Sequence, residues 1–413
     1  MSNGIVIVGG GLAAARVAKA FRGAGGTGSV TMLSDDVNLP YNRPPLSKGF
    51  LRGEMEADGV FVEPEAAYAE LDVDVRLGSE VTGVDVDAHT VTLAGGEHVP
   101  YDRLVLASGS RPRALATPGE ELDGVHHYRT LADAQAVRAA AGSATGALVI
   151  GGGFIGMETT ASLRRRGLAV TQIDMADALY ASLQNPPLSA SLERLYREHG
   201  VEVILGDKVA EFRGRDGRLT GAVTDGGREI EAELAIVGVG VQPSTAYLEG
   251  SGVDLERGTV LVDERFASNV PGIWAVGDIA NFHDPVFGHR RLIQHWTNAN
   301  HQGERLGRLL AGDDAPYDQV AFFFSEVFGT KIGLLGDLDG GHDALVTRGS
   351  FEDGAMIGWY LRDDRLVAAL IVGQTPEAQA EINDLLRGRA HVSDRAALAD
   401  PGAAVGAGFD TDG

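Results

Sequence analysis

Two glycine-rich turns are the part of this sequence whose residue types and spacing most directly predict chemistry. The first is the segment 9–14, GGGLAA, and the second is the segment 151–156, GGGFIG. A G-x-G-x-x-G/A turn between a strand and a helix lets the backbone approach a pyrophosphate, whose charge the helix N-terminus then stabilises. An acidic residue about 20 positions later can accept hydrogen bonds from ribose hydroxyls. Asp35 and Asp174 follow the two turns in this way, so the sequence predicts two dinucleotide sites.

Each turn must be positioned by the elements around it, and the same order of elements is expected at both. Short apolar runs are typical of buried parallel strands, and one precedes each turn while another follows each expected helix. We expect one set in strands 5–8 and 30–33 with a helix at 15–21, and the other in strands 147–150 and 170–173 with a helix at 157–166. A repeat of this kind predicts two mononucleotide-binding halves of similar design.

Further strands are predicted between and after these halves. Segments 73–77, 81–86 and 90–93 alternate at period two, so we expect them to be antiparallel strands inserted in the first domain. Segments 104–107 and 234–237 have buried-strand composition and each ends at a glycine-rich turn, where we expect the chain to cross between domains.

The composition limits the kinds of chemistry that are possible. The chain has no cysteine, which excludes a disulfide framework, a thiolate metal site and an iron–sulfur cluster bound by this chain. Its histidines lack the spacing of a metal-ligand set, so we expect no metal site. Redox chemistry would therefore need an organic cofactor. A formal charge of −23 disfavours nucleic acid and anionic membranes as partners.

The hydrophobic pattern predicts a cytoplasmic protein. No apolar run approaches the roughly 18 residues that a membrane span needs. The apolar run at 5–8 is too short for a signal peptide and leads directly into glycines.

Five further segments are more specific than a glycine turn. They are 39–48 (LPYNRPPLSK), 101–109 (YDRLVLASG), 128–131 (YRTL), 274–278 (WAVGD) and 295–299 (HWTNA). With these segments the chain, over roughly residues 3–390, resembles the FAD-dependent ferredoxin reductases of the glutathione-reductase fold. This family includes putidaredoxin reductase, rubredoxin reductase and the reductases of aromatic-ring dioxygenases. Apoptosis-inducing factor is a more distant relative.

The resemblance implies a fold and a domain order. The fold is α/β, with two Rossmann-like dinucleotide-binding domains and a small C-terminal α+β domain. We expect an FAD domain at 1–112 and 242–315, an NADH domain at 113–241, an α+β domain at 316–395, and a disordered tail at 396–413 that is rich in Gly, Ala and Asp.

The resemblance also implies a role for each matched position. The predicted FAD-binding residues are Gly9, Gly11, Ala13, Ala14, Asp35, Arg43, Lys48, Val81, Arg129, Asp278 and Trp296. The predicted NADH-binding residues are Gly151, Gly153, Ile155, Gly156, Asp174 and Gly240. Asp278 would bind the ribityl-phosphate end of FAD, and it could also cap a helix that starts at Ile279.

Lys48 and Glu158 are the predicted catalytic pair. In the family, a lysine of the Pro-Leu-Ser-Lys stretch approaches the flavin N5 and pairs with a glutamate just after the second glycine turn. A cation at that point would stabilise the anionic reduced flavin. The alternatives are a solvated surface lysine and a first-turn helix acid favoured by the dipole.

The residues around Asp174 predict NADH as the cofactor. A carboxylate repels a 2′-phosphate, and residues 175–177 contain no cation that could receive one. The arginines at 164–166 lie at the end of the preceding helix, where they serve its C-terminal dipole.

The sequence departs from the family pattern at two places. Many relatives have aromatic-Trp-Ser-Asp-Gln-Tyr in the third domain, whereas residues 323–328 are FFSEVF. Phe324 could still stack near the flavin but has no indole N–H. The segment 180–187, YASLQNPP, is also atypical.

We therefore expect an NADH-dependent FAD oxidoreductase that passes electrons singly to a small [2Fe–2S] ferredoxin serving a P450 or a Rieske oxygenase. The chain would be a monomer or a weak homodimer. The alternatives are a reductase of a small molecule, such as a quinone or an ascorbyl-type radical, and a redox-gated interaction protein resembling apoptosis-inducing factor. Cations for docking a partner are predicted at Arg43, Arg290, Arg291 and Lys331.

Overall fold

The computed structural model describes residues 4–410. Within them, residue contacts divide the chain into two compact units, and each unit is assembled from three separate segments. The first unit comprises residues up to Asn42, Val60–Arg111 and Gln242–Ala321, and the second comprises Arg43–Gly59, Pro112–Val241 and residues from Phe322 onward. Strands β8 (Ser110–Pro112) and β17 (Val241–Pro243) include two of the points at which the chain passes from one unit to the other.

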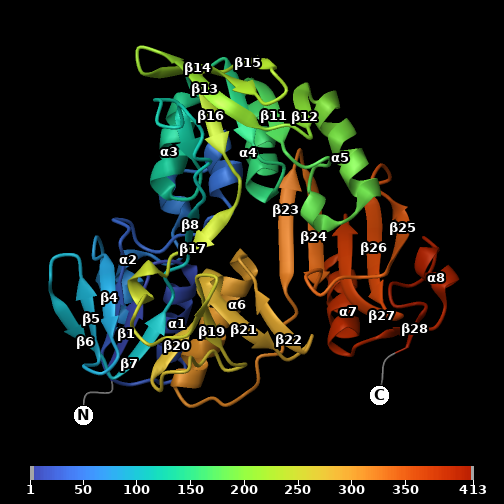
Figure 1. Ribbon diagram of the computed structural model, residues 1–413. Helices are drawn as coiled ribbons and strands as arrows, with labels where there is room; N and C mark the ends of the chain where they lie inside the picture. The colour runs from blue at the N-terminus through green and yellow to red at the C-terminus, as the bar shows by residue number, and fades with distance from the viewer. Residues whose placement is uncertain (1–3, 411–413) are drawn as a thin grey trace. The chain divides into compact units, whose positions relative to one another are not determined.

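The first unit contains a five-stranded parallel sheet around the first glycine turn (Figure 1). Its order is β20 (Ile273–Ala275), β7 (Arg103–Leu106), β1 (Ile5–Val8), β2 (Val30–Leu33) and β3 (Val73–Arg76). All four residues of β1 are buried, as expected for a central parallel strand. Helices α1 (Leu12–Gly23) and α6 (Trp296–Leu310) pack closely because Gly303 and Gly307 have no side chain: a Cβ on Gly303 would lie 2.5 Å from the Ala13 carbonyl oxygen.

One predicted strand of this region pairs differently from the expectation. β3 pairs in parallel with β2, with Val73 opposite Val30, so it is the edge strand of the main sheet and not part of an antiparallel insertion. Helix α2 (Glu65–Glu70) precedes β3 and provides the crossover that parallel pairing needs. The alternation in sequence arises because an edge strand is only partly covered. The antiparallel prediction holds for β4 (Val81–Asp85) and β5 (Thr90–Leu93).

The remaining elements of the first unit form small sheets. One consists of β4, β5 and β6 (His98–Pro100). The other consists of β18 (Leu255–Glu256), β19 (Thr259–Val262), β21 (Ala280–Asp284) and β22 (His289–Leu292). The elements η4 (Ala246–Leu248) and η5 (Gly277–Ile279) are short helical turns of this unit.

The β21–β22 pair corrects one predicted docking cation. The Arg291 side chain is 2% exposed and forms a 2.8 Å ion pair with Asp284, which is equally buried. Arg291 therefore serves packing inside the hairpin and cannot face a partner. Arg290 on the same strand is exposed.

The second unit repeats the parallel design around the second glycine turn. The sheet order is β12 (Val201–Leu205), β11 (Ala169–Asp174), β10 (Gly146–Ile150), β16 (Leu234–Val237) and β9 (Val125–His127). Its helices are α3 (Leu131–Ala140), α4 (Phe154–Arg165) and α5 (Pro186–Glu198), with η1 (Leu46–Phe50), η2 (Ala57–Val60, ending at the boundary) and η3 (Ala181–Leu183) as short turns. An antiparallel sheet of β13 (Val209–Arg215), β14 (Arg218–Thr224) and β15 (Glu229–Glu231) completes this part.

An antiparallel sheet, orange to red in Figure 1, follows in the same unit. Its main order is β23 (Phe322–Val327), β24 (Thr330–Gly336), β27 (Arg365–Val372), β26 (Ala355–Arg362) and β25 (Ala344–Ser350). Helix α7 (Pro376–Arg387) packs on β24 and β27. The predicted fold class is confirmed: two parallel Rossmann-like sheets and a C-terminal α+β segment are present.

The segment expected to be a disordered tail has regular structure up to Asp410. Residues 395–410 contain α8 (Arg395–Ala399) and β29 (Phe409–Asp410), which pairs with β28 (His391–Val392). Arg348 is only 5% exposed and donates to the carbonyl oxygens of Leu398 at 2.9 Å, Ala397 at 2.8 Å and Ala404 at 3.0 Å. A long-range anchor of this kind is not visible in local composition. Residues 411–413 lie outside the described residues.

Between residues 4 and 410, no helix is long and apolar enough to cross a membrane.

Candidate active site

The first glycine turn connects β1 to α1 in the first unit. Gly9 has φ +122°, and a Cβ there would lie 2.2 Å from the Ala107 carbonyl oxygen, so a side chain is excluded by both conformation and space. Gly11 is the N-cap of α1 and has no side-chain capping bond. Ala13 and Ala14 follow it, buried. The turn thus leaves the first N–H groups of α1 without a side-chain acceptor.

The acidic position after the first turn differs between the two halves. In each half, the first glycine N–H donates to the carbonyl of the strand residue opposite, Leu33 at 2.7 Å in one and Ile173 at 2.8 Å in the other. The next residue is Asp174 in the second half but Ser34 in the first. Asp35 lies one position further along and is exposed. The two predicted ribose acids therefore do not occupy equivalent positions.

A second carboxylate lies beside Asp35 and has defined contacts. Asp36 accepts hydrogen bonds from the Tyr41 hydroxyl and from the Asn38 backbone N–H, both at 2.9 Å. Sequence reasoning did not single it out, although it follows Asp35 directly. Asp36 is thus better ordered by its neighbours than Asp35 is.

The other predicted FAD residues of the first unit lie in three places. Val81 is the first residue of β4. Asp278 lies in η5 and accepts a 2.5 Å hydrogen bond from the Ser110 hydroxyl. The strand β21 follows at once, so Asp278 does not start an α-helix. Trp296 is the first residue of α6, and its Nε1 donates to Asn42 Oδ1 at 2.9 Å.

The second glycine turn connects β10 to α4 in the second unit. Gly151 has φ +112°, and a Cβ there would lie 2.4 Å from the Gly238 carbonyl oxygen. A Cβ on Gly156 would lie 1.9 Å from the Gly151 carbonyl oxygen. Gly153 is the N-cap of α4 without a side-chain capping bond, and Ile155 is 37% exposed.

Asp174 is held by the backbone around the second turn. Its Oδ2 accepts a short hydrogen bond from the Gly152 N–H, and its Oδ1 accepts one from the Ala176 N–H at 2.7 Å. The neighbouring Met175 is 75% exposed. Gly240, also predicted to bind NADH, is exposed with φ +97°.

The geometry of both turns fits a dinucleotide pyrophosphate. A Cβ added to Gly153 would meet no atom within 4 Å, so there is open space in front of α4. Neither α1 nor α4 has an acidic residue in its first turn. An uncapped helix start with no acidic residue in its own first turn is the arrangement that binds phosphate.

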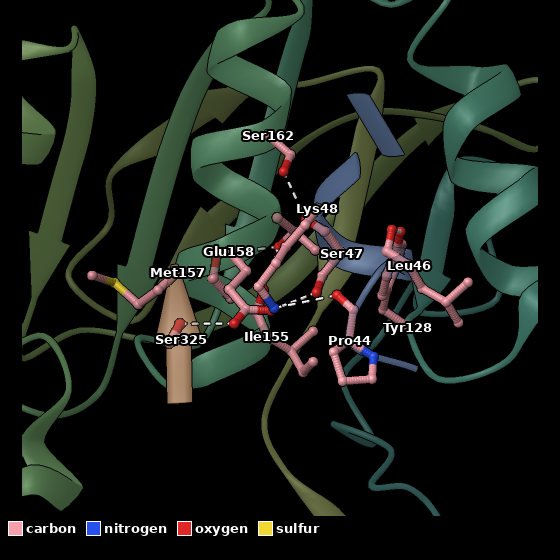
Figure 2. Close-up of polar contacts among 12 residues, drawn as sticks. Pro44, Leu46, Ser47, Lys48, Tyr128, Ile155, Met157, Glu158, Ser162 and Ser325 are labelled. Atoms are coloured by element: carbon pink, nitrogen blue, oxygen red, sulfur yellow. Dashed lines mark hydrogen bonds and ion pairs between the residues drawn. The ribbon is translucent and has the colours of Figure 1, made fainter. Parts of the chain in front are cut away.

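Lys48 and Glu158 are brought together within the second unit (Figure 2). Lys48 Nζ lies 2.6 Å from Glu158 Oε2, and the two side chains are 14% and 4% exposed. Lys48 Nζ also donates to the Pro44 carbonyl oxygen at 3.2 Å. The solvated-lysine alternative is therefore excluded. A buried pair of this kind is costly to desolvate, and removing one partner typically costs about 3–5 kcal/mol.

The turn that presents Lys48 has an unusual backbone. Lys48 itself has φ −120° and ψ −110° inside the short helical segment η1. The carbonyl groups just before it accept hydrogen bonds from side chains: Tyr128 donates to Leu46 at 2.6 Å and Ser162 donates to Ser47 at 2.7 Å. These side-chain bonds attach the irregular turn to α4 and to the residue before Arg129.

Three further residues complete the environment of Glu158, and sequence reasoning did not identify them as site residues. Ser47 donates to Glu158 Oε2 at 2.5 Å, and Ser325 donates to Oε1 at 2.7 Å. The Tyr180 hydroxyl lies 2.7 Å from the Ser325 hydroxyl. Burial and the Glu158 charge raise the pKa of Tyr180 well above 10, so its phenol stays protonated. Ser47 and Ser325 lie in segments that resemble family motifs, whereas Tyr180 has no such signal.

The remaining predicted residues of the second unit are near this cluster in the chain or in space. Arg43 precedes Pro44, and Arg129 precedes the capping residue of α3; both are partly buried. The Phe324 ring centroid lies 6.0 Å from Lys48 Nζ, at the limit of a cation–π contact. The aromatic position therefore stays beside Lys48 despite the loss of tryptophan.

Among residues 4–410, no group of three or more His, Asp or Glu side chains could hold a metal ion.

Comparisons with known proteins match nearly the whole chain. The profile of the family described as pyridine nucleotide-disulphide oxidoreductase matches residues 3–303, and the profile described as reductase C-terminal matches residues 322–407. The ferredoxin reductase component of chlorobenzene dioxygenase from Cupriavidus sp. (strain PS12) is 35% identical over 97% of this chain and 96% of that protein. Putidaredoxin reductase CamA from Pseudomonas putida is 32% identical over 91% and 90%.

The solved structures agree with this assignment. A crystal structure of the covalent putidaredoxin reductase–putidaredoxin complex superposes with a TM-score of 0.91 at 30% identity, covering 94% of each chain. These matches confirm the predicted resemblance, the oxidoreductase class and FAD and NAD(H) as the cofactors. The chain therefore belongs to the pyridine nucleotide-disulphide oxidoreductase family, within its group of ferredoxin reductases.

Proposed function

We propose that this chain is a cytoplasmic FAD-dependent reductase that takes a hydride from NADH and passes electrons singly to a small [2Fe–2S] ferredoxin, which serves a P450 or a Rieske oxygenase. The observation that best supports this is the buried Lys48–Glu158 pair, 2.6 Å apart, in a chain that contains both glycine turns and no cysteine. Without cysteine, electrons cannot pass through a dithiol of this chain, so a one-electron acceptor suits it better than a disulfide.

The glycine turns would bind the two dinucleotides. FAD, when bound, supplies a group that accepts a hydride and releases single electrons. The backbone N–H groups at the starts of α1 and α4 would hold the pyrophosphates, with Gly9, Gly11, Ala13 and Ala14 at one site. Gly151, Gly153, Ile155 and Gly156 would act at the other.

The polar residues would hold the rest of each cofactor. We propose Asp174 for the NADH ribose, Asp278 for the ribityl-phosphate end of FAD, and Arg129 for its phosphates. Asp35, Arg43, Val81, Trp296 and Gly240 keep the predicted binding roles. Asp36 is an additional candidate for the adenosine ribose of FAD because its carboxylate is ordered by Tyr41 and Asn38.

Lys48 would supply charge, not a proton. An ammonium group has three donors, and the contacts with Glu158 and Pro44 use two of them. The third would be available to the flavin, where a fixed positive charge stabilises the anionic reduced form.

The proposed partner rests on the relatives and on the charge of the chain. Ferredoxin reductases are the relatives that match most of this chain, and we propose the same kind of acceptor here. Because the net charge is −23, docking of an acidic ferredoxin would need exposed cations. Arg290 in the first unit and Lys331 in the second are both exposed, and each is a candidate on its own unit. We propose a monomer or a weak homodimer.

The test is anaerobic stopped-flow absorbance of the purified holoprotein with NADH, followed by a panel of oxidised [2Fe–2S] ferredoxins. Flavin bleaching and then rapid reoxidation by one ferredoxin is the expected result. Lys48→Met should slow bleaching about 100-fold, while Lys331→Met, at an exposed lysine of β24, should not. Bleaching that only a quinone or a radical acceptor reverses would contradict the ferredoxin assignment, and no bleaching would contradict the NADH assignment.

A further inference from the structure

Glu158 is held from both sides by residues of different segments. One oxygen receives Lys48 and Ser47, from the turn 46–50, and the other receives Ser325, from β23. Glu158 is itself only 3% exposed. A carboxylate buried this deeply depends on every donor it has, because no water replaces a missing one.

The direction of the hydrogen bonds around Ser325 is determined by its chemistry. A serine hydroxyl has one proton, and Ser325 uses it to donate to Glu158 at 2.7 Å. The Tyr180 hydroxyl, 2.7 Å away, must therefore donate to Ser325. The phenol can do this throughout the neutral range, because burial raises its pKa and keeps it protonated. The chain of donation runs from Tyr180 through Ser325 to Glu158. Figure 2 shows the part from Ser325 to Glu158 and the contact of Glu158 with Lys48.

Tyr180 is fixed in place at considerable conformational cost. It has φ +50° and is completely buried, a combination that is strained for an aromatic residue. Its backbone N–H donates to the carbonyl of Gly152, in the second glycine turn, at 2.8 Å. Its ring centroid lies 5.1 Å from that of Phe154. Tyr180 thus contacts the cofactor-binding turn through its backbone and the Lys48 cluster through its side chain.

On the basis of the proposed function, we propose that Ser325 and Tyr180 are positioning residues for the hydride-transfer site. Acting through Glu158, they hold the ammonium group of Lys48 in place. The position of that ammonium group in turn sets the electrostatic potential at the flavin. Neither residue would touch a cofactor. Through Ser325, the C-terminal segment that begins at β23 would therefore influence flavin reduction indirectly.

The test uses Ser325→Ala and Tyr180→Phe in the holoprotein. Each removes one hydroxyl and keeps the surrounding packing. We expect Ser325→Ala to slow flavin reduction by NADH about tenfold without changing the apparent affinity for NADH, because binding does not involve Glu158. The reduction equilibrium of the flavin should shift about tenfold, or about 30 mV to lower midpoint potential for a two-electron couple. Tyr180→Phe should shift both in the same direction by a smaller factor.

Two further variants distinguish positioning from general damage. Ser325→Thr keeps the hydroxyl and should restore both the rate and the potential. Tyr360→Phe is the matched control: Tyr360 is as deeply buried as Tyr180, but its hydroxyl donates to the Leu183 carbonyl at 2.6 Å, outside the chain of donors that leads to Glu158. It should leave the potential unchanged. If Ser325→Ala has wild-type rate and potential, or if Tyr360→Phe shifts the potential equally, the proposal is wrong.

A measurement without the flavin separates this proposal from the proposed function. In FAD-free protein, urea midpoints of Ser325→Ala, Glu158→Gln and the double variant form a double-mutant cycle. If Ser325 acts on Glu158, the double variant should unfold at a urea concentration close to that of the more destabilised single variant. Strictly additive shifts would contradict the proposal. Wild-type protein that NADH cannot reduce, with a coupled cycle, would contradict the proposed function only.

Discussion

Asp174, which we propose to bind the NADH ribose, has a carboxylate that the backbone holds in place. Both of its oxygens accept backbone N–H groups, one from Gly152 and one from Ala176. The carboxylate is therefore fixed at the C-terminal end of β11 and cannot rotate away from a ligand. A 2′-phosphate placed there would face a negative charge that cannot move aside, whereas a ribose hydroxyl would find an acceptor.

Asp174→Asn should lower the preference for NADH over NADPH. The substitution removes the charge but keeps the size of the side chain, and we expect the ratio of kcat/KM values to fall about tenfold, the equivalent of about 1.4 kcal/mol. Steady-state kinetics with both cofactors measures this. Asp216→Asn, in the exposed turn after β13, is the control that changes net charge equally. An unchanged ratio in Asp174→Asn would mean that another residue sets the preference.

At the scale of elements, two glycines of the second glycine turn meet different structural requirements at the start of α4. Gly156 allows the helix to approach the strand, since a Cβ there would lie 1.9 Å from the Gly151 carbonyl oxygen. Gly153 faces open space, because a Cβ on it would have no atom within 4 Å. Gly156 therefore meets a packing requirement besides its proposed binding role, whereas Gly153 leaves the helix N-terminus accessible.

Alanine at these two positions should have different effects. Gly156→Ala should lower the free energy of unfolding by about 2 kcal/mol, as overpacking does. Gly153→Ala should change stability little but weaken NADH binding about tenfold, because its methyl group would occupy the space of the pyrophosphate. Urea unfolding and titration with NADH measure the two quantities. Equal stability of the two variants would contradict the assignment.

Arg348 is the residue that attaches the segment 395–410 to the C-terminal sheet. Arg348→Met should leave several carbonyl groups without a donor and lower the free energy of unfolding by about 3 kcal/mol. Hydrogen exchange should increase in residues 395–410. Arg362→Met offers a control, since Arg362 donates to one exposed carbonyl, that of Gly340. Unchanged exchange in Arg348→Met would show that the segment is held by other contacts.

The features of the fold and the site that could be predicted from the sequence are those that depend on residues close together in the chain. The strands 5–8 and 147–150, the glycine turns and the helix at 157–166 depend on local pattern, and the structure has them within a few residues. The partners of Glu158 could be predicted only in part, because Ser325 lies 167 residues away in sequence. The same holds for the Arg348 contacts and for the parallel pairing of β3, which depends on its neighbour β2 and not on its own alternation.

At the scale of the whole molecule, the tyrosines set an alkaline limit to stability. Burial raises the pKa of Tyr101 and Tyr360 to about 12. It also raises the pKa of six others, namely Tyr68, Tyr128, Tyr180, Tyr196, Tyr247 and Tyr317. These are eight of the nine tyrosines in the chain. In the unfolded chain the same side chains ionise near pH 10.

Stability should therefore fall steeply above about pH 10. A group whose pKa is raised on folding contributes stability that is complete below the unfolded pKa and is lost as the pH rises toward the folded value. In that window, each buried tyrosine lowers the free energy of unfolding by up to about 1.4 kcal/mol per pH unit. Urea unfolding between about pH 8 and pH 11, with tyrosinate absorbance as a second signal, tests this. Tyrosinate absorbance that develops at about pH 10 in protein that stays folded would contradict it.

The discontinuous make-up of the second unit has a consequence for the order in which the protein can form during synthesis. Lys48 leaves the ribosome early, Glu158 follows, and Ser325 appears only when most of the chain has been made. Until then Glu158 lacks the donor to its Oε1. The hydrogen bonds of Glu158 are therefore completed only after β23 has been made, and a polypeptide interrupted before β23 would lack the Ser325 donor to this carboxylate.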